Sequence, residues 1–221
     1  MLIQSDIHFG NTLPPQTESC IKSEPMLFNC DVSHASSLGS TLTNLFLEAL
    51  PQDWTDGPLI IDSRSHMLMP EWYPCIPGWH HDEVPRTRSD AQPDYHSHFR
   101  SKHAMLLFNG DICPTEFALG NIDIDIPEIG SVIYRAWHPT ISQACADKKL
   151  TTVSAPSDKI IFFNDRTWHQ GTQAIKTGFR FFIRATMHFN EYGQRISRQK
   201  PAFNEIRQQS QVYLPQPFQG W

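Results

Sequence analysis

Residues 157–189 read SDKIIFFNDRTWHQGTQAIKTGFRFFIRATMHF, and this stretch carries three strand signals in succession. The signals are Lys159–Phe163, Thr167–Ala174 and Phe179–Phe189, which are rich in β-branched and aromatic residues. Turn-forming residues separate them, among them Thr177-Gly178 before the last run. The stretch therefore predicts a mainly β protein.

Upstream of this stretch the same pattern continues. Further strand candidates, separated by turn residues such as Asn109-Gly110, Pro127 and Gly130, are Leu59–Met69, Ala104–Phe108, Phe117–Ile126 and Ser131–Trp137. Six or more short strands after one helix favour a barrel or a jelly roll.

Helical character is confined to two segments. Residues 34–50 place apolar side chains at helical spacing, Ser36 or Ser37 could cap the start, and Pro51 ends the segment. Residues 195–209 could form a second helix, although Pro201 interrupts it. The aromatic tail, residues 213–221, is expected to be extended and to fold back onto the barrel.

Composition and length narrow the class of protein. The 221 residues suit a single domain, with an irregular or helical part over 1–57, a barrel over about 58–190 and an extension over 191–221. With 39% hydrophobic and 19% charged residues, the chain is expected to be globular. Its formal charge of −5 provides no general attraction for nucleic acid or for an anionic membrane.

The lack of a recognisable targeting signal and the pattern of cysteines predict a cytoplasmic protein. No apolar run approaches the roughly 20 residues that span a bilayer, and the first residues, MLIQSDIHFGN, lack a signal-peptide pattern. The five cysteines are odd in number and form no Cys-x-x-Cys pair, so neither a disulfide framework nor a zinc ribbon is expected. A reducing compartment is the expected location.

The segment PGWHHDEVPR, residues 77–86, concentrates metal-ligand side chains. In an extended chain His80 and Asp82 share one face, while His81 and Glu83 share the other. Either His-x-carboxylate pair could bind a metal ion, and a distant second histidine would complete a set of two histidines and one carboxylate, which suits iron(II) with open positions. His169, at the start of a downstream strand, is the candidate.

The last predicted strand contains two arginines in an apolar run, Arg180 and Arg184. They lie an even number of residues apart, so they face the same side of the strand. A buried guanidinium is costly unless an anion meets it, and its planar fork suits a carboxylate.

The set His80-x-Asp82, His169 and Arg180 resembles the iron(II)/2-oxoglutarate-dependent oxygenases, over roughly residues 58–190. The resemblance implies a double-stranded β-helix, a jelly-roll or cupin-like barrel with a few flanking helices. It also implies that the two histidines and the aspartate bind Fe(II), that Arg180 binds the distal carboxylate of 2-oxoglutarate, and that O2 is the second cosubstrate. The 89 residues from His80 to His169 lie within the family's usual range.

Arginines eleven and fifteen residues after His169 are most similar to the taurine-dioxygenase branch. This likeness implies that Thr115 is a second anchor for 2-oxoglutarate and that Arg184 either meets the primary substrate or has a structural role. Hydroxylation of a small molecule is the expected reaction, and the basic residues near the site point to an anionic substrate.

Several alternatives stay open at this stage. His81 with Glu83 could replace His80 with Asp82 as the ligand pair, or His81 and Trp79 could line the substrate site. The residues 84–102 form a polar loop that is either solvated or a lid. His96, His98 and His103 could form a cupin-type metal site, although the glutamate such a site needs is missing. The protein could also be a cupin-like enzyme without 2-oxoglutarate, or a jelly-roll binding protein without catalysis. Membrane and nucleic-acid partners are not expected, and the oligomeric state cannot be inferred.

Overall fold

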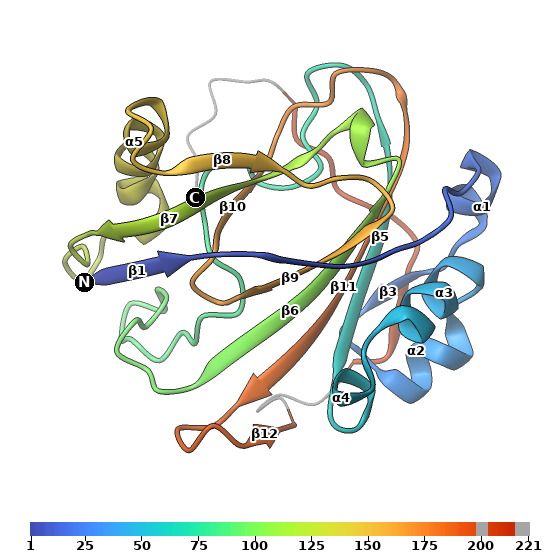
Figure 1. The fold of residues 1–221 in the computed structure, drawn as a ribbon, viewed down its shortest axis with the longest axis horizontal. Helices are drawn as coiled ribbons and strands as arrows, with labels where there is room; N and C mark the ends of the chain where they lie inside the picture. Colours follow the sequence, from blue (N-terminus) through green and yellow to red (C-terminus); the bar gives the residue numbers. More distant parts are fainter. Residues whose placement is uncertain (198–202, 215–221) are drawn as a thin grey trace.

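The computed structural model describes residues 1–197 and 203–214, which form two facing antiparallel sheets with helices on the outside (Figure 1). The helices are α1 (Glu18–Ser23), α2 (Val32–Leu38), α3 (Thr41–Ala49), α4 (Gln52–Thr55) and α5 (Ile133–Ala146), with a 3-10 turn at Gly110–Ile112. Among the described residues, no helix has the length and apolar character that crossing a bilayer requires.

The larger sheet has the order β2-β9-β6-β11-β5-β4. Its strands are β2 (His8–Thr12), β4 (Cys30–Asp31), β5 (Ile60–Leu68), β6 (Arg100–Phe108), β9 (Lys159–Asn164) and β11 (Gly178–Phe189), and β12 (Arg195–Ile196) pairs with the end of β11. β11 is central and pairs with β5 on one side and β6 on the other.

The smaller sheet is built on β7 (Thr115–Asp123). β10 (Trp168–Gly171) pairs along one edge of β7, while β8 (Thr151–Ser154) and β1 (Leu2–Ser5) pair with successive parts of the strand. An isolated bridge between His80 and His169 adds the residue 80 segment beyond β10.

The chain order of these strands gives a double-stranded β-helix. β5 lies in the larger sheet, the residue 80 segment in the smaller, β6 in the larger, β7 and β8 in the smaller, β9 in the larger, β10 in the smaller and β11 in the larger. Two antiparallel sheets that the chain enters in this alternation, each contributing four of the strands named here, form a jelly roll. The predicted mainly β, jelly-roll fold is therefore confirmed.

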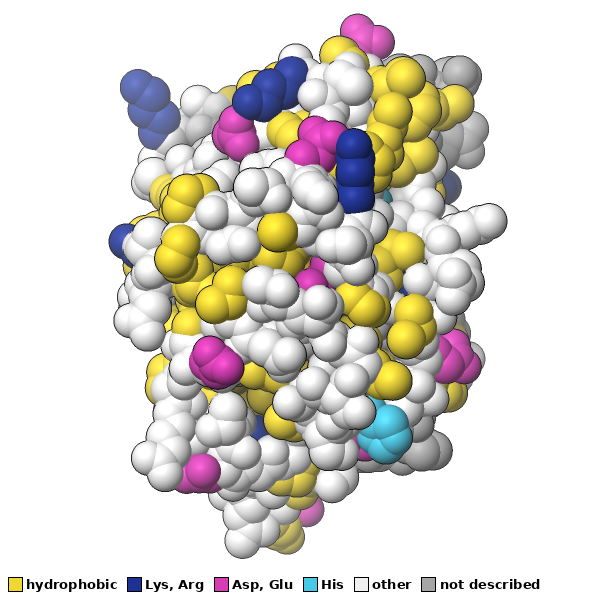
Figure 2. Space-filling model, turned by 90° about the vertical axis from the view of Figure 1, so that its right-hand side faces the viewer, with side chains coloured by type: hydrophobic (Ala, Val, Ile, Leu, Met, Phe, Trp, Pro, Cys, Tyr) yellow, Lys and Arg dark blue, Asp and Glu magenta, His cyan; other side chains and the backbone are white. Residues whose placement is uncertain are grey.

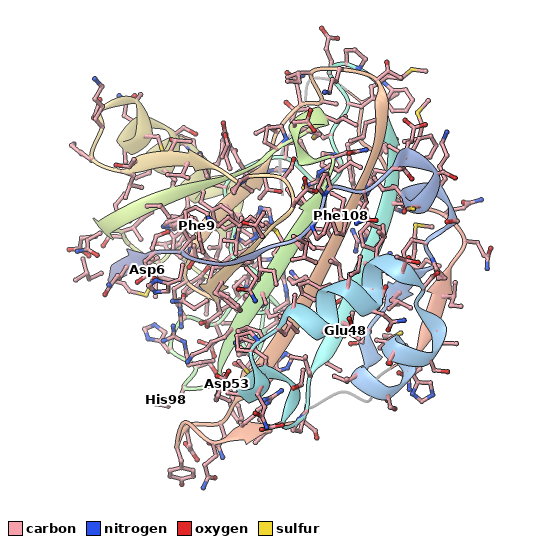
Figure 3. All side chains as sticks on the ribbon, turned by 45° about the vertical axis from the view of Figure 1, so that its right-hand side comes forward. Asp6, Phe9, Glu48, Asp53, His98 and Phe108 are labelled. Atoms are coloured by element: carbon pink, nitrogen blue, oxygen red, sulfur yellow. The ribbon has the colours of Figure 1, made fainter. Side chains whose placement is uncertain are left out.

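Strand alternation divides the interior between two cores. Leu106, Ile183 and Ala185 face outward from the larger sheet and pack with helices α2 and α3, which cross this face (Figures 1 and 3). Leu107 and Phe163, from the same sheet, point inward and pack against Phe117 of the smaller sheet. Because both faces of the larger sheet are covered, residues 104–108 of β6 and 160–163 of β9 are apolar on both sides.

The single helix predicted over residues 34–50 is wrong, because the chain breaks at Gly39 into α2 and α3. Gly39 has an extended backbone, and a side chain there would collide: its Cβ would lie 2.5 Å from the Thr43 Cβ atom and 2.7 Å from the Ala35 carbonyl oxygen. Asp31, not Ser36 or Ser37, caps α2. The buried carboxylate of Glu24 accepts hydrogen bonds from the backbone N–H groups of Ser40, Leu42 and Thr43, at the start of α3.

The strand predicted over residues 131–137 is also wrong, because this segment begins helix α5. Ile133, Trp137, Ile141 and Ala144 are buried at helical spacing against the smaller sheet. The aromatic and β-branched residues of this seven-residue segment are typical of a strand. The helical spacing becomes visible only over the whole length of α5.

The helix predicted over residues 195–209 is wrong where the structure describes it. Residues 195–196 form β12 and Glu205–Arg207 form β13, which pairs with β3 (Met26–Phe28). Residues 198–202 lie outside the described part. The tail does return to the barrel at Tyr213, which bridges Tyr73, while residues 215–221 lie outside the described part.

The side of the molecule that carries α1–α3 shows scattered charges of both signs (Figure 2). Among the described residues on this face, basic and acidic side chains are interspersed.

Candidate metal centre and cosubstrate pocket

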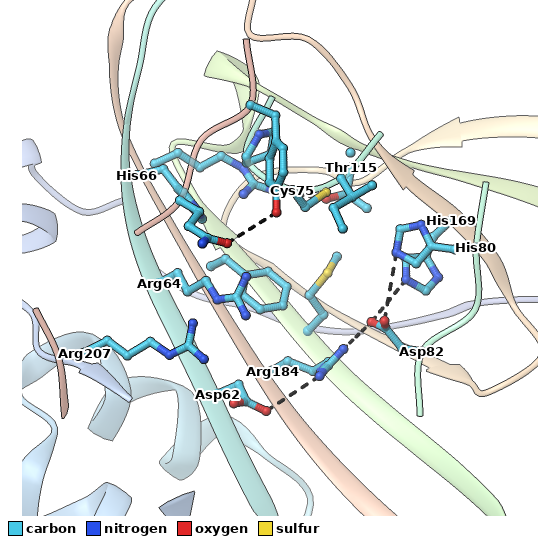
Figure 4. Close-up of a pocket in the computed structure, with 18 of the residues that line it drawn as sticks. Asp62, Arg64, His66, Cys75, His80, Asp82, Thr115, His169, Arg184 and Arg207 are labelled. Carbon is cyan, nitrogen blue, oxygen red and sulfur yellow. Dashed lines mark hydrogen bonds and ion pairs between the residues drawn. The ribbon is translucent and has the colours of Figure 1, made fainter. Parts of the chain in front are cut away.

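The backbone brings His80 and His169 together from opposite ends of the barrel sequence. His80 N–H donates to the His169 carbonyl over 3.0 Å, and His169 N–H donates back over 3.2 Å. The two imidazole rings consequently lie side by side, with centroids 4.5 Å apart. Asp82 follows two residues later and turns its carboxylate toward both rings (Figure 4).

Each histidine is oriented by a hydrogen bond on its far nitrogen. His80 Nδ1 lies 2.8 Å from the Gly78 carbonyl oxygen, and His169 Nδ1 lies 2.9 Å from the Thr167 carbonyl oxygen. A carbonyl can only accept, so Nδ1 carries the proton and Nε2 keeps its lone pair when the ring is neutral. Both Nε2 atoms face the Asp82 carboxylate, at 3.9 Å and 3.2 Å. Backbone partners of this kind are what orients histidines that bind metals.

The electrostatics fit a divalent cation. Burial lowers the pKa of His80 to about 4, so its imidazole is neutral at pH 7. Burial alone would raise the pKa of Asp82. The nearby Arg184 and His169 outweigh burial, so the pKa of Asp82 lies well below its usual value. Two imidazole nitrogens and one carboxylate oxygen lie within 4.8 Å of one another. This donor set suits iron(II) and leaves positions open for other ligands.

The same cavity contains the predicted cosubstrate anchors. It has a volume of about 400 Å³ and is lined by the three ligands together with Thr115 and Arg180. The Arg180 Nη2 atom donates to the Thr115 hydroxyl oxygen over 3.0 Å. Arg180 is only 2% exposed, and no described carboxylate pairs with it. Burial lowers the pKa of this guanidinium, which is the unfavourable state that a bound carboxylate would relieve.

Arg184 lies deeper in the ligand set than expected. Its Nη1 donates to the Asp82 carboxylate, and its Nη2 lies 3.6 Å from Asp62. Burial lowers the pKa of Arg184, but the two aspartates outweigh it and raise the pKa. The guanidinium therefore orients Asp82, a member of the candidate ligand set, and contact with the primary substrate stays a prediction.

Sequence reasoning missed the cavity wall formed by β5. Asp62, Arg64 and His66 alternate along this strand and all line the cavity. In the pairing of β5 with β11 they stand opposite Arg184, Phe182 and Arg180 respectively. Their spacing of two residues along a predicted strand was the available signal.

His81 and Trp79 do not line this cavity, although His81 lines a second cavity that also contains Asp82, so their contact with the substrate stays a prediction. The His81 ring packs 3.8 Å from the Trp168 ring, between centroids, and its Nδ1 lies 2.6 Å from the Tyr95 hydroxyl. Trp79 is 3% exposed and belongs to the core beneath α5. The pair His81 and Glu83 is therefore not the ligand pair.

The other histidine group does not form a metal site within the described residues, where His80, Asp82 and His169 are the one set of three donors. His103 is buried, with its Nδ1 atom 3.0 Å from the Thr186 hydroxyl.

The loop that precedes β6 lines a second cavity, of about 410 Å³, which shares Asp82 with the first. Val84, Arg86 and Phe99 contribute to its wall. The loop lies beside Asp82, and its role as a lid over the site remains a prediction.

Comparisons with solved structures find similar folds at low identity. The epimerase SnoN from nogalamycin biosynthesis, described as non-heme and alpha-ketoglutarate-dependent, is 11% identical with a TM-score of 0.46, over 85% of this chain and 79% of its own. Iron-bound HygX from Streptomyces hygroscopicus is 11% identical with a TM-score of 0.42, over 85% of each chain. EvdO2 from Micromonospora carbonacea var. aurantiaca, complexed with 2-oxoglutarate, is 11% identical with a TM-score of 0.40, over 89% and 74%.

No family model and no curated protein matches the sequence. Because the three TM-scores lie below 0.5, the function of this chain has to be argued from its own residues.

Proposed function

We propose that this protein is an iron(II)- and 2-oxoglutarate-dependent dioxygenase that hydroxylates a small molecule. One observation carries the proposal: a buried guanidinium without an acidic partner, Arg180, opens into the same cavity as the ligand set His80, Asp82 and His169. A metal site alone would not need that cation. A cosubstrate that binds the metal at one end and presents a carboxylate at the other would use both features.

The residues have separate tasks in this proposal. His80, Asp82 and His169 would hold iron(II), while Arg180 and Thr115 would hold the distal carboxylate of 2-oxoglutarate. When bound, the iron with 2-oxoglutarate and O2 supplies an oxidation that couples decarboxylation of 2-oxoglutarate to succinate with attack on a C–H bond. Met105, Phe163 and Phe182 line the cavity and exclude water from it.

Succinate formation tests the proposal directly. Protein supplied with iron(II), ascorbate and 2-oxoglutarate is expected to form succinate slowly even without a primary substrate. His169→Ala should abolish this turnover. Arg180→Gln should raise the 2-oxoglutarate concentration needed for half-maximal rate at least tenfold, because the carboxylate loses its bidentate partner. Arg135→Gln, on the exposed face of α5, is the matched control.

The outcomes separate the alternatives. Metal binding without succinate would indicate a cupin-like enzyme that does not use 2-oxoglutarate, and absence of metal binding would indicate a jelly-roll binding protein. An unchanged response of Arg180→Gln to 2-oxoglutarate would remove Arg180 from the site. Once a substrate is found, a product heavier by one oxygen atom distinguishes hydroxylation from other oxidations.

A further inference from the structure

Two more guanidinium groups face the cavity and have no role in the function proposed above. Arg64 comes from the middle of β5, and Arg207 from the end of β13. Figure 4 shows both side chains directed into the space beside Asp62 and Arg184. Neither guanidinium makes a hydrogen bond or an ion pair with a described residue, whereas Arg184 in the same wall is paired with two carboxylates.

Arg207 is held in place without using its hydrogen-bond donors. Its guanidinium carbon lies 3.6 Å from the centroid of the Phe28 ring, on the neighbouring strand β3. Stacking on an aromatic ring orients a guanidinium plane through one face and leaves the N–H groups at its edge available. The free N–H groups of an arginine oriented in this way can bind a planar or a tetrahedral anion.

The charge of the cavity is not balanced by the cofactors. Among the described residues, four arginines and two aspartates line it, an excess of two positive charges when histidines are not counted. Iron(II) would add two positive charges and 2-oxoglutarate two negative charges, so the excess would remain in the loaded site. The whole chain, in contrast, has a formal charge of −5. The positive charge is thus local to this cavity.

Arg64 lies apart from Arg180, the proposed anchor for 2-oxoglutarate. Arg180 stands opposite His66 and binds Thr115, whereas Arg64 stands opposite Phe182, one inward-facing position nearer to Arg184. Burial and the neighbouring Arg207 and Arg184 lower the pKa of Arg64, and Asp62 offsets only part of this because its carboxylate also pairs with Arg184. An oxyanion between the two guanidinium groups would relieve the remaining repulsion.

We infer that Arg64 and Arg207 bind an oxyanion group of the primary substrate, a carboxylate, sulfate or phosphate, and so present the rest of that molecule to the metal. This inference rests on the proposed function for the metal and the cosubstrate, and it adds the substrate class. Part of the recognition then comes from the C-terminal segment, since Arg207, Gln211 and Tyr213 all line the cavity.

Calorimetric titration with simple anions tests the inference. Sulfate and acetate are titrated into protein loaded with manganese(II), used in place of iron to prevent turnover, and with saturating 2-oxoglutarate, at constant ionic strength. At least one of the two anions is expected to bind. Arg64→Gln and Arg207→Gln should each weaken that binding at least tenfold, and Arg135→Gln should leave it within twofold. The preferred anion tells whether the natural group is tetrahedral or planar.

The dissociation constant of 2-oxoglutarate, measured in the same preparations, separates the two anion sites. It should rise at least tenfold in Arg180→Gln and less than threefold in Arg64→Gln. Anion binding that is absent, or equal in wild type and both variants, would overturn the inference and leave the proposed function intact. A tenfold loss of 2-oxoglutarate affinity in Arg64→Gln would also overturn it. Anion binding that depends on the pair, in a protein that forms no succinate, would instead overturn the proposed function.

Discussion

His80 and His81 are adjacent in the chain, yet they face different environments. His80 turns its Nε2 atom toward Asp82 and the cavity, while His81 packs on Trp168 and contacts Tyr95. Successive side chains of an extended backbone point to opposite faces, so adjacent residues here can be a candidate metal ligand and a packing residue. The two histidines therefore provide a matched pair of substitutions.

We expect His80→Gln to weaken metal binding at least a hundredfold, because one of three protein ligands is lost. His81→Gln should leave metal affinity within about threefold, but it should lower the free energy of unfolding by about 1–3 kcal/mol, since a buried hydrogen bond and ring packing are lost. Equilibrium dialysis with manganese(II) and urea unfolding measure the two effects. Equal losses of metal affinity in both variants would contradict the assignment of ligands.

At the scale of elements, the N-terminal helices depend on a capping contact between distant residues. Glu24 is 5% exposed, and its carboxylate accepts from three backbone N–H groups and from the Thr43 hydroxyl, over 2.6–3.0 Å. An anion at a helix N-terminus satisfies donors that have no partner within the helix. This contact orients α3 across the outer face of the larger sheet, which supports the strand that carries Asp62, Arg64 and His66.

Glu24→Gln should destabilise the protein by about 2 kcal/mol, because an amide nitrogen would face backbone donors where a carboxylate oxygen now accepts. Glu48→Gln, on the exposed side of α3 (Figure 3), is the control and should change the free energy of unfolding by less than about 0.5 kcal/mol. Denaturant unfolding of both variants provides the comparison. Similar stabilities for the two would show that the cap does not matter.

At the scale of the whole molecule, the barrel buries an unusual set of neutral histidines. Burial lowers the pKa of His66 and of His103 to about 3, that of His80 to about 4, and that of His81 well below its usual value. In the unfolded chain each returns to a pKa of about 6.5. Between these values the unfolded chain binds protons that the folded protein does not, so stability falls as the pH decreases below about 6.5.

We expect the metal-free protein to lose stability steeply between pH 6.5 and pH 4, by up to about 1.4 kcal/mol per pH unit for each such histidine. His103→Gln should reduce this slope by about that amount without reversing it. His8→Gln, at an exposed position on β2, should not change the slope. Urea unfolding in a chelating buffer at several pH values provides the slopes, and identical slopes for wild type and His103→Gln would refute this origin of the acid sensitivity.

Several strands of the barrel and the chain order of the candidate ligands could be predicted from the sequence alone. The runs that became β5, β6, β9 and β11 were recognisable because period-two patterns and turn residues are local properties. His80, Asp82, His169 and Arg180 were recognisable because their residue types and spacing limit the chemistry. Helix α5 and the break at Gly39 were not, since a longer helical period and a close contact with Thr43 decided them.

The surroundings of the candidate metal site depend on long-range pairing of strands. The register between β5 and β11 sets His66 beside Arg180 and Asp62 beside Arg184, and the pairing of β3 with β13 brings Arg207 to the same cavity from the far end of the chain. Pairing register is a long-range property, fixed by which faces are buried together rather than by any local run of residues. The positive excess of the cavity, and with it the inferred substrate class, arises at that level.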